Sequence, residues 1–370
     1  MHVSPAISKT MLQRFLLTTL LLLAPISQAM ASAWPQWEAY KHRFIQPDGR
    51  VVEYSQQART TSEAQAYALF HALVANDRKS FDKILSWTEN NLADGDLTRQ
   101  LPAWLWGKRP TGDWGIIDDN AASDADMWLA WVLLEASEKW HAKHYRKLGK
   151  GLLKLIERHE VTQLPGLGYM VLPGPDGFVT DNKRWKLNLS YLPLQVIRKF
   201  SHTGDSTIWT EVLRNSITLI DRASVNGIVP DWVIYQADGR LQASNSSAAN
   251  HIGYDAIRVY LWAGMLPPSE PTRTSLLQQL TRDCVERITP SASESPGMKI
   301  AIAPLMKTTG NTRCLGQLVN LVDRSWHQGL LGDPARYYDQ NLSMFALAWL
   351  EKRYAFTADG GLLTRHHETD

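Results

Sequence analysis

The chain contains little cysteine, since Cys284 and Cys314 are the only two among 370 residues. Two cysteines cannot form a disulfide framework, and these two do not make a metal-binding motif. In an oxidising compartment they could pair with each other. The sequence leaves that pairing open, because it does not show whether the two Cα atoms come within about 7 Å. It does exclude a fold held together mainly by disulfides.

The chain also lacks a Pro/Gly/Ser-rich linker, a low-complexity tract and a block of like charge. It is long for one domain, yet the absence of a linker favours a single domain over residues 34–370. The formal net charge of +2 equals the charge of Lys9 and Arg14 alone, so the remainder of the chain is neutral. A neutral domain argues against nucleic acid or an anionic membrane as the main partner, and we expect a monomer.

The N-terminal segment is typical of an export signal. Lys9 and Arg14 precede an apolar run at 15–24, and small residues follow with cleavage sites at 29–31 and 31–33. The run is shorter than the about 20 apolar residues of a membrane span. We predict a signal peptide over 1–33 and a periplasmic or secreted protein without a membrane segment after cleavage. An uncleaved anchor, or a start at Met11, are the alternatives.

Apolar residues recur with helical spacing along most of the chain. The pattern predicts two helices between residues 60 and 92, then helices near 123–140, 145–158, 190–201, 207–223, 252–265, 270–288, 297–308, 311–325 and 338–353. The extended segment 164–174 and a hairpin over 227–242 interrupt them. These helices, joined in pairs by short turns, predict an all-α fold of helical hairpins with small β-hairpin and loop insertions.

Tryptophan is abundant, with 15 copies that all lie beyond residue 33. An indole ring combines a flat apolar face with one N–H donor, which suits core packing and also contact with the C–H faces of sugar rings. We expect most of these rings in the core and about a third or fewer in a cleft.

Glu63 follows Thr60 at the spacing of a capping box, with Thr60 as N-cap and Glu63 three residues later. That structural role is one interpretation. The other is a general acid, which requires a carboxyl kept protonated by burial or by a like charge. Tyr67, one turn further along, would help to exclude water from it.

Asp124 and Asp126 begin another apolar helix, where acidic residues favour the helix dipole. At a spacing of two residues their side chains face different directions, so one can enter a cleft while the other stays structural. We favour Asp124 for the cleft. Asp255 has a structural interpretation as the ion-pair partner of Arg258 three residues later. A paired arginine also keeps an aspartate ionised, as a general base must be.

Five motifs occur in an order that resembles family 8 glycoside hydrolases, particularly the periplasmic endoglucanases encoded with bacterial cellulose synthase. The resemblance covers about residues 34–262 and is weaker beyond. The motifs are Thr61-Ser62-Glu63-x-Gln65-x-Tyr67, Leu101-Pro102-Ala103-Trp104-Leu105-Trp106-Gly107, Ala122-Ser123-Asp124-Ala125-Asp126, Asn188-x-Ser190-Tyr191 and Tyr254-Asp255-Ala256-Ile257-Arg258.

The resemblance implies an (α/α)6 barrel with one catalytic domain over 34–370 that cleaves internal β-1,4 links of a glucan with inversion, without metal or cofactor. It implies Glu63 as general acid and Asp255 as general base, which suits the two carboxyls that glycoside hydrolysis uses. It implies that Asp124 holds and distorts the sugar and that Tyr191 places the water. The residues that it implies for the glucan cleft are Trp104, Tyr254, Arg258 and Trp185. Possible partners are the cellulose synthase and export complex.

The sequence departs from the family pattern at two positions, which keeps alternative functions open. Relatives usually have glycine where Ala64 and Ala68 stand, and their methyl groups could narrow the cleft or shift Glu63. A non-catalytic glucan-binding accessory protein of cellulose export is therefore one alternative. The same fold acting on xylan or chitosan is another, because a fold alone does not choose a substrate. The chain shows no acidic excess of the kind that would favour chitosan.

Overall fold

The computed structural model describes residues 34–180, 183–244, 251–280 and 295–364. The predicted signal peptide, residues 1–33, and Cys284 lie outside these ranges. Cys314 is disulfide-bonded. No helix in the described ranges has the length and apolar character to cross a membrane.

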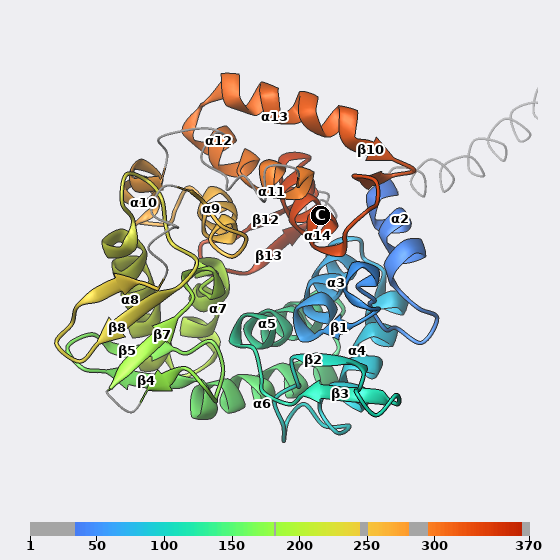
Figure 1. Ribbon diagram of the computed structural model, residues 1–370, viewed down its shortest axis with the longest axis horizontal. Coiled ribbons are helices and arrows are strands. Elements are labelled where there is room, and N and C mark those ends of the chain that lie inside the picture. The colour runs from blue at the N-terminus through green and yellow to red at the C-terminus, as the bar shows by residue number, and fades with distance from the viewer. Residues whose placement is uncertain (1–33, 181–182, 245–250, 281–294, 365–370) are drawn as a thin grey trace, which may run out of the picture.

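Helices dominate the described part of the chain and form two concentric layers (Figure 1). In the inner layer each helix contacts the next, and the last returns to the first. This closed ring of helical hairpins is the (α/α)6 barrel that was predicted. The inner helices are α3 (Ser62–Val74), α5 (Ser123–Lys139), α7 (Leu194–Thr203), α9 (Ile257–Gly264), α11 (Pro296–Ala301) and α14 (Tyr337–Leu350).

The outer helices cover the inner ring, and each packs on an inner helix close to it in the chain or, for α2, on α14. The difference between the layers follows from composition. Inner helices such as α3 and α5 are buried on nearly every face, as expected for helices that are apolar all round. Outer helices keep one polar face. They are α2 (Pro35–Phe44), α4 (Arg78–Leu92), α6 (Lys143–His159), α8 (Ser206–Ala223), α10 (Arg273–Leu280), α12 (Ala303–Thr309) and α13 (Thr312–Ser325).

Aromatic rings from four inner helices fill the centre of the barrel. Phe70 of α3 stacks on Phe345 of α14 at 4.5 Å between ring centroids. Trp128 of α5 and Trp262 of α9 lie 5.2 Å apart, and both rings also contact Phe345. Such ring pairs stabilise a core beyond their buried area alone. The centre of the barrel is therefore packed, and a site has to lie at one end of it.

Short antiparallel strands connect the helices, as the sequence predicts. One sheet has the order β1-β2-β3, with Thr61 opposite Leu105, and a second has the order β6-β7-β8-β9. The hairpin expected within 227–242 is β8 and β9. The strands are β1 (Thr60–Thr61), β2 (Leu105–Lys108), β3 (Trp114–Asp118), β4 (Val161–Leu164), β5 (Gly168–Val171), β6 (Val179–Thr180), β7 (Arg184–Leu187), β8 (Val233–Gln236), β9 (Leu241–Ala243), β10 (Trp326–His327), β11 (Leu330–Leu331), β12 (Tyr354–Phe356) and β13 (Leu362–Thr364).

Candidate active site

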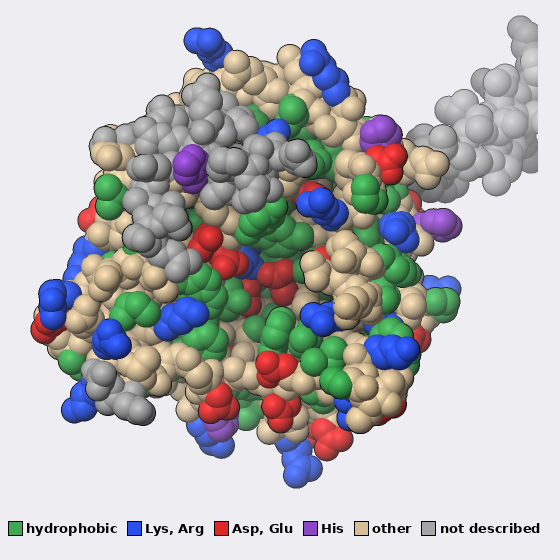
Figure 2. All heavy atoms as spheres, viewed as in Figure 1, with side chains coloured by type: hydrophobic (Ala, Val, Ile, Leu, Met, Phe, Trp, Pro, Cys, Tyr) green, Lys and Arg blue, Asp and Glu red, His purple; other side chains and the backbone are tan. Residues whose placement is uncertain are grey.

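A pocket of about 420 Å³ opens at one end of the barrel. Figure 2 shows acidic side chains gathered in the hollow near the centre of this face. The pocket brings together seven of the eight residues that the sequence singles out, which come from segments far apart in the chain. They are Glu63, Trp104, Asp124, Tyr191, Tyr254, Asp255 and Arg258.

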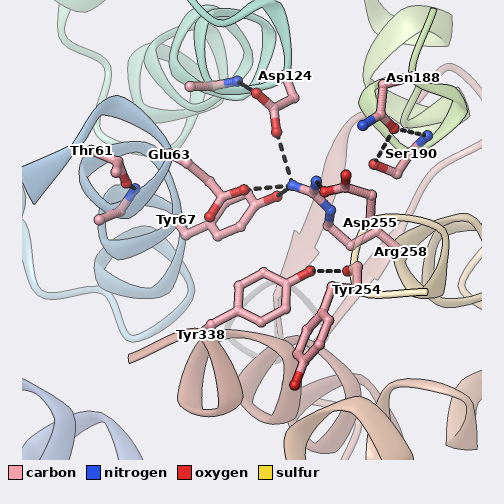
Figure 3. A network of polar contacts seen from close by, with 12 residues as sticks. Thr61, Glu63, Tyr67, Asp124, Asn188, Ser190, Tyr254, Asp255, Arg258 and Tyr338 are labelled. Carbon is pink, nitrogen blue, oxygen red and sulfur yellow. Dashed lines mark hydrogen bonds and ion pairs between the residues drawn. The ribbon is translucent and has the colours of Figure 1, made fainter. Parts of the chain in front are cut away.

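Glu63 lies in the first turn of α3, and its side chain points into the pocket rather than back toward the helix start (Figure 3). The predicted capping box is wrong. Thr61, not Thr60, is the N-cap, because its hydroxyl oxygen accepts the N–H of Ala64 at 3.1 Å. The Thr60 hydroxyl is buried and donates instead to the Val51 carbonyl oxygen. Glu63 is thus free of a capping role.

Asp124 lies in the first turn of α5 and is 3% exposed. One of its carboxylate oxygens accepts the N–H of Ala125 at 2.8 Å, and the other faces Arg258. Asp126 is completely buried and does not line the pocket. The two aspartates therefore diverge in the way that their spacing predicts.

Asp255 lies just before a helix rather than in one. The sequence predicts a helix from about residue 252, but α9 begins at Ile257. The backbone N–H groups of this segment bond to a side chain instead of to a preceding helical turn. One oxygen of Asp231 accepts the N–H of Asp255 at 3.1 Å and the N–H of Ala256 at 2.7 Å. A Cβ on Gly253 would lie 2.0 Å from the Asp231 carboxylate, so a larger residue here would displace that carboxylate from its present position. Asp231 thereby fixes the segment that carries Asp255.

Arg258 is the centre of the site, and Glu63, Asp124 and Asp255 point toward it from three elements (Figure 3). Its guanidinium is 2% exposed and donates to Glu63 at 2.5 Å, to Asp124 at 2.8 Å and to Asp255 at 3.0 Å. The planar fork of an arginine suits such multiple contacts. The sequence predicts only the contact with Asp255.

The shared guanidinium limits how far apart the two proposed catalytic carboxyls lie. Glu63 and Asp255 contact different nitrogens of Arg258. Two hydrogen bonds and the width of one guanidinium separate the bonded oxygens by at most about 8 Å. That limit is compatible with the about 6.5–9.5 Å between the carboxyls of inverting glycosidases.

Burial in the site raises the pKa values of two aspartates. Burial raises the pKa of Asp124 to about 7, although Arg258 lowers it, and the nearby charge of Glu63 raises it further. Burial also raises the pKa of Asp231. Asp124 therefore takes up a proton near neutral pH, where an ordinary aspartate is fully ionised.

Two tyrosines complete the site, and the sequence analysis missed both. Tyr337 and Tyr338 begin α14 and line the pocket. The Tyr337 hydroxyl donates to Glu63, and that of Tyr338 donates to the backbone oxygen of Tyr254 at 2.6 Å. They lie in the part of the chain where the resemblance is weak. The feature of the sequence that could have indicated them is the pair of adjacent tyrosines at the start of a predicted helix.

The remaining predicted residues have different positions. Tyr191 ends a short 3₁₀ turn that the Asn188 side chain caps, and the Tyr191 ring lies 5.4 Å from the Arg258 guanidinium carbon. Trp104 lines the pocket, and its backbone oxygen accepts the N–H of Ser62 at 3.0 Å. The structure does not bring Trp185 to the pocket. Its ring is 7% exposed and packs in the core.

No group of three or more His, Cys, Asp or Glu side chains that could hold a metal is found within the four described ranges. The polar groups of the pocket include carboxylates, phenols, hydroxyls, one indole and the two guanidinium groups of Arg59 and Arg258. Such a site can transfer protons and bind the apolar and hydroxyl faces of a sugar.

Comparison with known proteins agrees with this site. Residues 11–352 match the model of the family described as "Glycosyl hydrolases family 8". The chain belongs to this family and is a glycoside hydrolase. The family 8 chain is 41% identical to an endoglucanase of Xanthomonas axonopodis pv. citri (strain 306), over 89% of its own length and 88% of that protein. It is 38% identical to an endoglucanase of Escherichia coli (strain K12), over 94% and 95%.

A solved structure is similar as well. The endo-1,4-D-glucanase from Vibrio fischeri ES114 is 36% identical, with a TM-score of 0.79 over 91% of this chain and 100% of that one. The match extends over most of the described residues and supports one family 8 fold along the chain.

Proposed function

We propose that this family 8 hydrolase is an inverting endo-β-1,4-glucanase that cleaves cellulose-type glucan. The observation that carries the proposal is the convergence of Glu63, Asp124 and Asp255 on Arg258 in one pocket. The endoglucanase names of relatives at 41% and 38% identity support the substrate.

Glu63 and Asp255 would divide the proton transfers of the reaction. Glu63 donates a proton to the glycosidic oxygen as the bond from that oxygen to the anomeric carbon breaks. Asp255 takes a proton from a water molecule, whose oxygen forms the new bond to the same carbon from the opposite face. Attack from the opposite face inverts the configuration. The new reducing end carries the hydroxyl group from water, and the leaving oxygen carries the proton from Glu63.

Arg258 prepares Asp255 for its role as the base. Arg258 keeps a contact to Asp255 that stabilises the carboxylate form of a base. When Glu63 is protonated it no longer forms an ion pair with Arg258, while Asp255 still does. Arg258 can therefore stay in place through the proton transfer.

The other pocket residues would hold the sugar. Asp124 can accept or donate a hydrogen bond near neutral pH because burial raises its pKa to about 7, and this suits contact with a sugar hydroxyl. Tyr191 lies beside Arg258 and would place the attacking water. The rings of Trp104 and Tyr254 line the pocket and can stack on sugar faces.

The cellular role that fits these residues is editing of cellulose outside the cytoplasm. The apolar segment at 15–24 supports export, and the resemblance to endoglucanases encoded with cellulose synthase supports a glucan made by the same cell. We propose a periplasmic or secreted monomer that acts near the cellulose synthase and export complex.

The non-catalytic alternative rests on Ala64 and Ala68, whose methyl groups could narrow the cleft. Both residues are fully buried in α3, and neither lines the pocket. The pocket retains Glu63 and Asp255, which supports catalysis over binding alone.

The test is the release of reducing ends from carboxymethylcellulose by wild type, Glu63→Gln and Asp255→Asn. We expect each variant to lose about 10²–10⁴-fold or more, the contribution of general acid or base catalysis. Tryptophan fluorescence with cello-oligosaccharides checks that the variants still bind. Wild-type binding without any hydrolysis would favour the accessory protein, and preference for xylan or chitosan in a substrate panel would replace the glucan.

A further inference from the structure

Positive charge is concentrated on one outer helix. α6 carries six Lys and Arg residues and a single Glu within 17 residues, whereas the whole chain has a net charge of +2. All six side chains are exposed. They define what we term the α6 basic stripe: Lys143, Arg146, Lys147, Lys150, Lys154 and Arg158.

The stripe occupies one face of the helix. At 3.6 residues per turn its six positions fall within an arc of about 120°, and they extend along about 22 Å of the helix axis. The opposite face of α6 carries Tyr145, Leu152 and Ile156, which are buried against the barrel. Packing therefore fixes which side of α6 faces outward, and all the cations lie on that side.

No residue in the described ranges forms an ion pair with a cation of the stripe, although acids lie nearby. The neighbouring acids have other partners. Glu138 pairs with Lys199 at 3.1 Å, and Glu157 accepts the indole N–H of Trp209 at 2.7 Å. Asp205 caps α8. The pKa of Asp96 is lowered mainly by hydrogen bonds from Thr98 and also by the charge of Lys147, so only a small part of the positive charge of the stripe is compensated within the described ranges.

The stripe lies beside the active site rather than across it. α6 packs behind α5, and it forms the lower edge of the ring in Figure 1. None of its residues lines the catalytic pocket. A partner bound along α6 would leave the pocket open to a glucan.

We infer that the α6 basic stripe docks the enzyme on an anionic lipid surface, with phosphate head groups as the ligands. Two surface hollows of about 780 and 580 Å³ run along the stripe, and Lys147 and Lys150 line both. Glu138 lines the first hollow, and Glu157 and Asp205 line the second. Because these acids already have partners within the protein, the cations remain available to phosphate groups. None of the large hydrophobic side chains exposed in the described ranges lies on α6, so contact would be electrostatic and without insertion.

Charge complementarity sets the expected strength. Each Lys or Arg near an anionic membrane surface strengthens binding by about fivefold. Loss of three cations should therefore weaken binding by about 100-fold or more. Salt should weaken it as well, since the Debye length is only about 8 Å at physiological ionic strength. The balanced net charge of the domain hides this local asymmetry.

The test uses residues 34–370, which contain every described residue and omit the apolar segment that would itself enter lipid. Sedimentation with phosphatidylglycerol-containing vesicles and with neutral phosphatidylcholine vesicles is compared for wild type and Lys147→Glu/Lys150→Glu/Lys154→Glu. The control is Lys307→Glu/Arg313→Glu/Arg324→Glu, which changes the net charge equally at exposed positions on other helices.

We expect salt-sensitive binding of wild type and control to anionic vesicles alone, and about 100-fold or more weaker binding of the stripe variant. Equal binding by the two variants would overturn the inference. Retention by poly-glutamate without binding to vesicles would overturn it in favour of an acidic protein partner. All three proteins should hydrolyse uncharged cello-oligosaccharides equally, so the result is independent of the proposed glucanase activity.

Discussion

A single aspartate outside the predicted set positions the proposed base. The Asp231 carboxylate accepts two backbone N–H groups of the segment that carries Asp255. We expect Asp231→Ala to lower kcat by about 10–100-fold, as misplacement of a catalytic group by about 1 Å does, with little change in KM. Kinetics on carboxymethylcellulose would measure both constants.

Asp231→Asn is the matched control for this prediction. Its amide oxygen can accept the same two N–H groups, so most of the activity should return. An equal loss of kcat in both variants would assign the effect to the lost charge. Full activity in Asp231→Ala would show that the segment carrying Asp255 keeps its position without Asp231.

Replacing Arg258 by lysine separates the effect of charge from that of geometry. Lysine keeps the positive charge but lacks the planar guanidinium group. Three carboxylates share the guanidinium, and one ammonium cannot reproduce its geometry. We expect Arg258→Lys to lose at least tenfold in activity and about 1–3 kcal/mol in free energy of unfolding, the cost of a buried polar group left without a partner. Urea unfolding measures the second effect. An unchanged unfolding midpoint would contradict it.

At the scale of helices, close packing between α9 and α12 depends on Gly264. A Cβ at this position would lie 2.3 Å from the backbone nitrogen of Leu305. We expect Gly264→Ala to destabilise the fold by about 1–3 kcal/mol, as overpacking does. Gly316 in α13 is the control, since a Cβ there meets nothing within 4 Å. Gly316→Ala should stabilise by about 0.5–1 kcal/mol, so thermal melts should shift in opposite directions.

The helical elements could largely be predicted from the sequence, and the exceptions have physical causes. The helix predicted over 190–201 is interrupted, because Pro193 lacks an N–H and stands at the N-cap of α7. Tyr191 therefore lies on a short 3₁₀ turn. The late start of α9 depends on Asp231, 24 residues away in the chain.

Pocket residues could be predicted where they belong to local motifs, as Glu63, Asp124 and Asp255 do. The role of Arg258 as their common partner could not, because its contacts span up to 195 residues of sequence. Trp185 was misplaced for a related reason. Its aromatic ring suits a cleft or a core equally well, and only the packing of β7 puts it in the core.

Across the whole molecule, buried acids predict how stability depends on pH. Burial raises the pKa of Glu160 well above its usual range, and the charge of Asp126 raises it further. The folded protein therefore binds a proton that the unfolded chain releases above about pH 4. Stability contributed by this group is present at low pH and is lost as pH rises through the folded pKa.

Replacing Glu160 by glutamine removes this dependence. We expect the melting temperature of Glu160→Gln to exceed that of wild type by a margin that grows between about pH 5 and 8. Circular dichroism melts over that range would test it. A margin that is constant, or that shrinks at higher pH, would contradict the raised pKa.

Closure of the ring has a consequence for how the enzyme matures. Glu63 stands in the first inner helix, and the Tyr337 hydroxyl that bonds to it comes from the last. Synthesis from the N-terminus therefore makes the proposed acid early and its hydrogen-bond partner 274 residues later. A chain that is still being synthesised therefore has an incomplete site until nearly the whole barrel has been made.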